Sequence, residues 1–74
     1  MTKLEEFVEF MGKAIEEKKG INVLITMPDL PHPEMIVNPA CNIKTKSEYY
    51  RKAYNDNLEL KTYNAIKIEH YESF

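Results

Sequence analysis

Three side chains that could bind a metal or take part in catalysis are His32, Cys41 and His70. Zinc sites combine such residues at short spacings of the CxxC or HxxxH kind. Asp29 or Glu69 of this chain could add a carboxylate ligand. No two of the three residues have that spacing, so we predict that the chain has no metal site. We expect His32 to be a solvated loop residue, Cys41 a small buried residue, and His70 part of a strand.

Nucleophilic catalysis would need Cys41 or Ser47 beside a base, and neither histidine lies in a recognisable nucleophile motif. The twelve Asp and Glu residues single out no acid/base pair, and their positions match solvated helix faces. The two glycines, Gly12 and Gly20, are too few and too far apart for a phosphate-binding loop. We therefore predict a protein that is not an enzyme and uses no cofactor.

The segment of residues 28–42, PDLPHPEMIVNPACN, contains all four prolines of the chain. Proline fixes φ and removes a backbone donor, so this segment should be stiff and partly exposed, as contact surfaces often are. Phe10 lies at the edge of the apolar stripe of a predicted helix and is expected to be exposed. Our first hypothesis is a non-enzymatic binding protein that contacts a protein partner through Pro31, His32, Pro33 and Phe10.

The alternative hypothesis is a homo-oligomer that binds or sequesters a small ligand or nucleotide. Its pocket would lie between two subunits, because one short chain has little volume for both a core and a cavity. Asn38, Cys41 and Asn42 would line this pocket.

A third hypothesis, weak nucleic-acid binding, arises from five tyrosines near several basic residues. Two observations make it the least favoured of the three. Tyr50 and Tyr54 fall on the helix face that should pack on a sheet, and the net charge is −2.

The length of 74 residues predicts one domain, residues 1–74. A core of this size rarely supplies more than about 3–5 kcal/mol, and a single cysteine cannot form an internal disulfide, so a homodimer or a partner complex is expected. Glu5, Glu6 and Glu9 replace the basic start of a signal peptide, and no apolar run approaches the roughly 20 residues of a membrane span. These features predict a cytoplasmic protein that does not bind membranes.

Hydrophobic periodicity predicts two helices. The first covers residues 3–19: Thr2 and Glu5 form a capping box at its start, and Gly20 provides a left-handed cap after its end. A second capping-box pattern, at residues 45–48, starts the other helix. The sequence allows two ends for this helix: the Asn-Asp-Asn run at 55–57 could cap it, or the helix could continue to about Lys61.

Three strands are predicted: residues 21–27, residues 35–37, and residues 65–71. The core-facing side chains of the first strand are expected to be Ile21, Val23, Ile25 and Met27. The first two should pair as a hairpin. A right-handed crossover through the second helix would then place the second and third strands parallel. The expected fold is α+β in the order α-β-β-α-β, with a three-stranded mixed sheet and two helices packed on one face.

The run Pro33-Glu34-Met35-Ile36-Val37-Asn38-Pro39, followed by Asn42, Glu48-Tyr49-Tyr50, Ala53-Tyr54-Asn55, Leu58, Leu60 and Lys61, resembles small uncharacterised proteins of bacteriophages and prophages of Gram-positive bacteria. This resemblance covers roughly residues 30–70. Such proteins commonly bind a host or phage protein, and some inhibit bacterial defence systems. The resemblance therefore implies a phage or mobile-element protein that acts by protein binding, and it carries no active-site motif.

Overall fold

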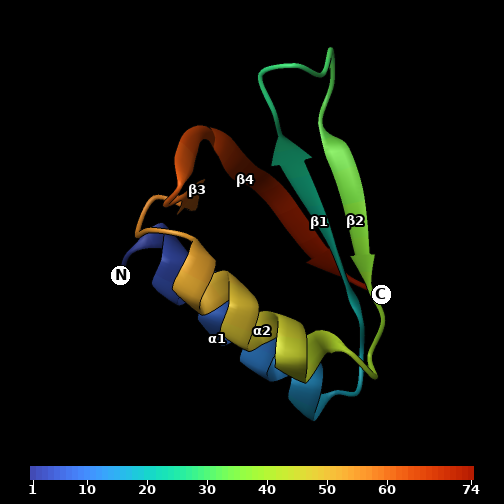
Figure 1. The fold of residues 1–74 in the computed structure, drawn as a ribbon. Helices are drawn as coiled ribbons and strands as arrows, with labels where there is room; N and C mark the ends of the chain where they lie inside the picture. Colours follow the sequence, from blue (N-terminus) through green and yellow to red (C-terminus); the bar gives the residue numbers. More distant parts are fainter.

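The computed structural model describes residues 1–74 and has two helices packed on one face of a four-stranded antiparallel sheet (Figure 1). The predicted α+β class is therefore confirmed. The elements in chain order are α1 (Lys3–Glu16), β1 (Ile21–Thr26), β2 (Glu34–Asn38), α2 (Ile43–Ala53), β3 (Glu59–Leu60) and β4 (Tyr63–Ser73).

The strand order across the sheet is β2-β1-β4-β3, and every neighbouring pair is antiparallel. The predicted hairpin of β1 and β2 is confirmed, with Val23 opposite Ile36. The predicted three-stranded mixed sheet is wrong. Because β2 and β4 are both antiparallel to β1, they do run in the same direction, as a crossover requires. However, β1 lies between them, so no parallel ladder forms.

The strand that the sequence did not predict is β3. It occupies Glu59–Leu60, where the sequence allows a continuation of the second helix to about Lys61. The helix α2 ends at Ala53, and the chain then turns through Asn55. The Asn55 side-chain oxygen accepts hydrogen bonds from the backbone N–H groups of Asn57 (2.9 Å) and Glu59 (3.0 Å). Leu58 adopts a left-handed conformation with φ of 63° and is nevertheless buried. This turn reverses the chain so that Glu59 pairs with Lys67.

The capping box at the start of α1 is confirmed. Glu5 N–H donates to the Thr2 hydroxyl (3.1 Å), and Thr2 N–H donates to the Glu5 carboxylate (2.8 Å), which lowers the pKa of Glu5. The predicted end of the helix is wrong, because α1 stops at Glu16. The left-handed residue after it is Lys18, with φ of 57°, and Gly20 has no positive φ.

The second helix starts earlier than its sequence pattern predicted. Asn42 is the N-cap residue of α2 and makes no side-chain capping bond, so Thr45 does not begin the helix. Ile43 is only 1% exposed. Burial of this side chain explains the early start, since it stabilises a helical turn that lacks a cap.

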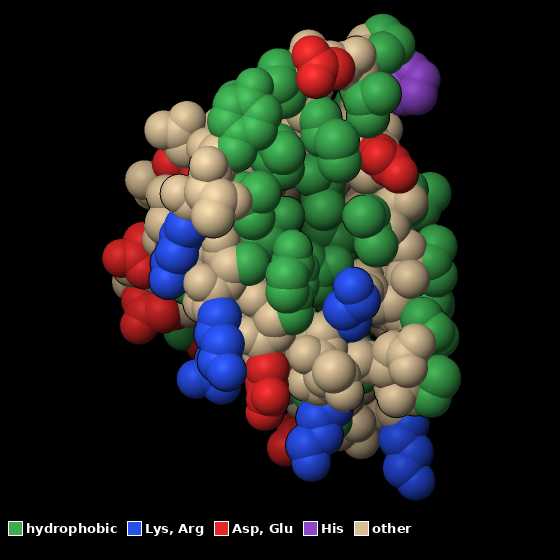
Figure 2. All heavy atoms as spheres, viewed as in Figure 1, with side chains coloured by type: hydrophobic (Ala, Val, Ile, Leu, Met, Phe, Trp, Pro, Cys, Tyr) green, Lys and Arg blue, Asp and Glu red, His purple; other side chains and the backbone are tan.

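The core lies between the helices and the sheet. Ile21, Val23 and Ile25 face it from β1, as predicted, and Phe7 packs between the rings of Tyr50 (5.4 Å) and Tyr71 (4.6 Å). The helices do not cover the whole face. Figure 2 shows apolar side chains exposed on the sheet beside α2. Three side chains that pack against the core from β1's end, β2 and β4 are only partly buried: Met27, Ile36 and Ile66.

Candidate functional site

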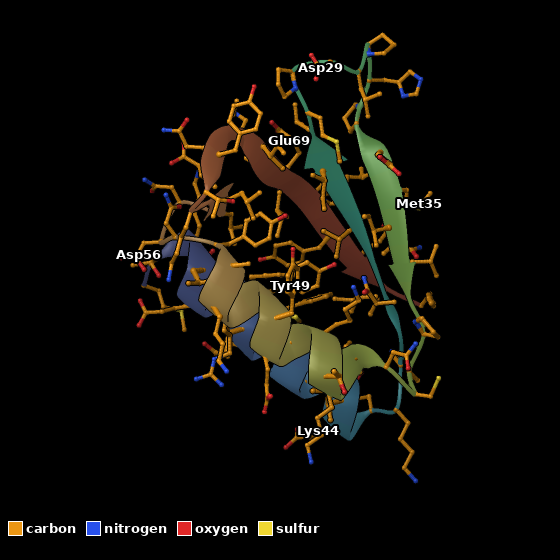
Figure 3. The ribbon with its side chains drawn as sticks, in the orientation of Figure 1. Asp29, Met35, Lys44, Tyr49, Asp56 and Glu69 are labelled. Atoms are coloured by element: carbon orange, nitrogen blue, oxygen red, sulfur yellow. The ribbon has the colours of Figure 1, made fainter.

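The loop between β1 and β2 projects beyond the rest of the sheet (Figure 1). We call residues 28–33 the hairpin tip; all six are exposed, and Figure 3 shows Asp29 at its end. A turn within the loop is closed by the Leu30 N–H, which donates to the Met27 carbonyl (3.2 Å). The predicted contact residues Pro31, His32 and Pro33 therefore lie together on the outermost part of the molecule.

The hairpin tip combines stiffness with an apolar side chain. Each of its prolines fixes one φ angle, which reduces the conformational entropy that the loop would lose on binding. Leu30 is 40% exposed between these prolines. The His32 ring nitrogen Nδ1 lies 3.3 Å from the Pro33 carbonyl oxygen, and the residue is exposed. These properties suit contact with another protein surface.

Exposed apolar side chains continue from the hairpin tip along β2. Met35 and Val37 are 56% and 58% exposed and lie opposite Leu24 and Asn22 of β1, on the face of the sheet that has no helices. Sequence reasoning did not select either residue. The signal was present in the strand alternation, because Ile36 alone can face the core if its two neighbours face away.

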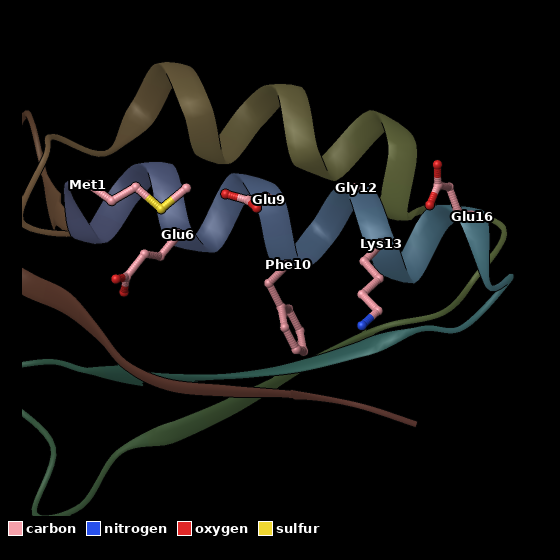
Figure 4. Close-up of a pocket in the computed structure, with 7 residues that line it drawn as sticks. All are labelled: Met1, Glu6, Glu9, Phe10, Gly12, Lys13 and Glu16. Carbon is pink, nitrogen blue, oxygen red and sulfur yellow. The ribbon is translucent and has the colours of Figure 1, made fainter.

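Phe10 is half-buried rather than exposed, and its ring packs on Tyr71 at 4.8 Å. It lines a surface hollow of about 720 Å³ together with Met1, Glu6, Glu9, Gly12, Lys13 and Glu16 (Figure 4). Burial, followed by the nearby Glu6 carboxylate, raises the pKa of Tyr71. The hairpin tip lies at the opposite end of the molecule from the helices, so Phe10 does not share a surface with it (Figure 1).

The residues of the small-ligand hypothesis are not brought together around a cavity. Asn38 is 1% exposed, and its amide nitrogen donates to the Tyr50 hydroxyl (3.3 Å) and the Ile36 carbonyl (3.3 Å). Cys41 and Asn42 are exposed in the loop before α2. The expectation that Cys41 is buried is therefore wrong. None of the four surface hollows contains any of these three residues.

No group of three His, Cys, Asp or Glu side chains is placed to hold a metal ion. His70 lies in β4, as expected, with its Nε2 atom 4.0 Å from the Glu72 carboxylate. His32 is on the hairpin tip and Cys41 follows β2, so the three candidate ligands come from separate parts of the chain.

The tyrosines of α2 divide between the core and the surface. Tyr50 and Tyr54 are buried, and this burial raises the pKa of both hydroxyls, that of Tyr54 to about 12. Tyr49 is half exposed, and its ring lies 5.3 Å from the Lys46 ammonium group. A surface for stacking successive bases would need several exposed rings, and α2 provides one.

Comparison with known proteins gives no relative from which a function could be transferred: no family model, no curated protein and no solved structure matches the chain. Neither helix is long and apolar enough to cross a membrane.

Proposed function

We propose that this protein acts by binding another protein, and that the hairpin tip is its contact surface. The observation that carries the proposal is the position of residues 28–33 at the end of a projecting hairpin. There, three prolines stiffen the loop around the exposed Leu30 side chain. The resemblance to phage and prophage proteins, some of which inhibit host defence systems, agrees with this class of function. No catalytic role is proposed.

A stiff exposed loop favours binding because little order must be gained when the complex forms. Leu30 can fill an apolar pocket on the partner, and His32 can exchange a hydrogen bond with it. Asp29 adds a negative charge at the end of the loop, so a partner surface with basic residues around an apolar pocket would fit best.

The test compares tagged proteins as bait in lysates of candidate host cells. One variant replaces Pro31, His32 and Pro33 by alanine, and the control variant replaces Lys61, Thr62 and Asn64, which are exposed in the turn between β3 and β4 and at the start of β4. We expect a protein that is retained in stoichiometric amount by the wild type and the control and is lost with the tip variant, while circular dichroism is unchanged. Equal retention by all three baits would refute the proposal.

A further inference from the structure

The strand β2 forms one free edge of the sheet, and its residues alternate between backbone groups that face β1 and backbone groups that face away from the sheet. Phe74 N–H donates to the Gly20 carbonyl, so the even-numbered residues of β1 near this end direct their backbone groups toward β4. The backbone groups of the odd-numbered residues of β1 then point toward β2. The Ile21 carbonyl agrees with this, because it accepts from the Asn38 side-chain amide nitrogen of β2 at 3.5 Å. Because Ile21, Val23 and Ile25 lie opposite Asn38, Ile36 and Glu34, these β2 residues are bonded within the sheet.

The free N–H and C=O groups of β2 therefore belong to Met35 and Val37. The next positions with the same parity are Pro33 and Pro39, which have no N–H group. The free edge can thus form strand hydrogen bonds only through Met35 and Val37, and a proline limits it on each side. Its two open residues carry exposed apolar side chains, whereas the unpaired part of β4 carries charges that discourage pairing: Glu69, His70 and Glu72.

We propose that β2 pairs antiparallel with β2 of a second copy of this chain, with the two-fold axis at Ile36. Met35 of each copy then lies opposite Val37 of the other, and every free N–H on this edge finds a free C=O. Moving the axis to Met35 or Val37 would set a donor-less proline opposite one of them. The two sheets would join into one continuous sheet, and the half-buried Ile36 side chains would meet across the axis.

Charge complementarity selects the same arrangement. Residues 28–37 carry Asp29 and Glu34 and no Lys or Arg, while residues 38–47 carry Lys44 and Lys46 and no acid. Antiparallel pairing brings the segment with Asp29 and Glu34 in one copy toward the start of α2 in the other copy, which carries Lys44 and Lys46. The two-fold axis creates this contact twice. A parallel arrangement would place like charges together. The first turn of α2, which has no acidic residue of its own, would lie near the acidic end of the neighbouring copy.

This inference does not rest on the proposed function, because the strand pairing uses the backbone groups of Met35 and Val37 and none of Pro31, His32 and Pro33. The first measurement is sedimentation of the purified chain across a range of concentrations. We expect a mass near twice 8.7 kDa. The variant with both Met35→Lys and Val37→Lys sets each introduced lysine opposite another and should weaken self-association by roughly 100-fold or more. Tyr63→Lys, at a residue 51% exposed, is the control and should leave the dimer intact.

The register is tested by cross-linking in a Cys41→Ser background. Ile36→Cys should form an intermolecular disulfide on mild oxidation, because the two introduced thiols face each other across the axis, whereas Met35→Cys alone should not. A monomeric wild type at millimolar concentration would overturn the proposal, as would a dimer that survives both lysines. Cross-linking through position 35 but not position 36 would overturn the register. Loss of partner binding in the tip variant with an intact dimer would separate the two proposals.

Discussion

Asn38 of β2 and Tyr50 of α2 join the sheet to the second helix through a buried polar contact. The Asn38 amide nitrogen donates to the Tyr50 hydroxyl at 3.3 Å, and the Asn38 side-chain oxygen lies 3.5 Å from the same hydroxyl. Both residues are at most 2% exposed. A buried polar pair of this kind stabilises the fold only while both partners are present, because each leaves the other unsatisfied when removed.

Replacing Tyr50 by Phe should lower the free energy of unfolding by about 1–2 kcal/mol, since the Asn38 amide loses one of its partners inside the core. The double variant with Asn38→Leu should recover part of that loss, because no unpaired polar group then remains. Urea titrations of the single and double variants measure this coupling. Tyr49→Phe, at a half-exposed ring on the same helix, is the matched control and should change stability little. Equal effects of the two Tyr→Phe changes would contradict a role for the contact.

Gly20 is predicted to be intolerant of a methyl group for steric reasons alone. A Cβ atom there would lie 2.5 Å from the Phe74 ring and 2.6 Å from the Asn38 carbonyl oxygen. Gly20→Ala should therefore cost about 1–3 kcal/mol. Adding Phe74→Ala should rescue only part of this cost, because the backbone carbonyl cannot move aside. Gly12→Ala is the control: nothing lies within 4 Å of the added atom, and thermal unfolding should show a gain of about 0.5–1 kcal/mol.

The features that could be predicted from sequence depend on neighbours close in the chain. The capping box joins Thr2 to Glu5, and the alternation in β1 depends only on residues two apart. The sequence predicts Gly20 at the left-handed position that Lys18 in fact occupies. The crowding that requires glycine at position 20 comes from Phe74 and Asn38, both distant in sequence, so the neighbouring residues do not reveal it.

The sheet topology could not be predicted in the same way. The position of β1 between β2 and β4 depends on which strands meet after the crossover, and the left-handed Leu58 contradicts the usual preference of its residue type. At the candidate site, the exposed prolines followed from local chemistry. The exposure of Met35 and Val37 did not, because it depends on β2 being at the edge of the sheet.

The turn after α2 should depend on the Asn55 side chain. Its oxygen accepts from two backbone N–H groups, and its amide nitrogen donates to the Glu59 carboxylate at 3.1 Å. Asn55→Ala should cost about 1–2 kcal/mol, because these backbone donors lose their partner. Asn55→Asp keeps the acceptor but sets a carboxylate beside that of Glu59. The loss of stability in this variant should therefore become smaller when Glu59→Gln removes the second negative charge. Hydrogen exchange should show faster exchange at Glu59 in the alanine variant, and unchanged protection there would disprove the role of the side chain.

Alkaline pH should unfold the protein through its buried tyrosines. Burial raises the pKa of Tyr54 from 10.0 to about 12, and it also raises the pKa of Tyr50. Between these values the unfolded chain releases protons that the folded chain retains, so the free energy of unfolding is unaffected below pH 10 and falls as the pH rises toward 12. The contribution of Tyr54 is on the order of 1–2 kcal/mol.

Urea midpoints measured from pH 8 to 11 should fall more steeply for the wild type than for Tyr54→Phe, which has no proton to lose. Tyr63→Phe, at an exposed ring, should follow the wild type. Parallel curves for wild type and Tyr54→Phe would mean that another group controls alkaline unfolding.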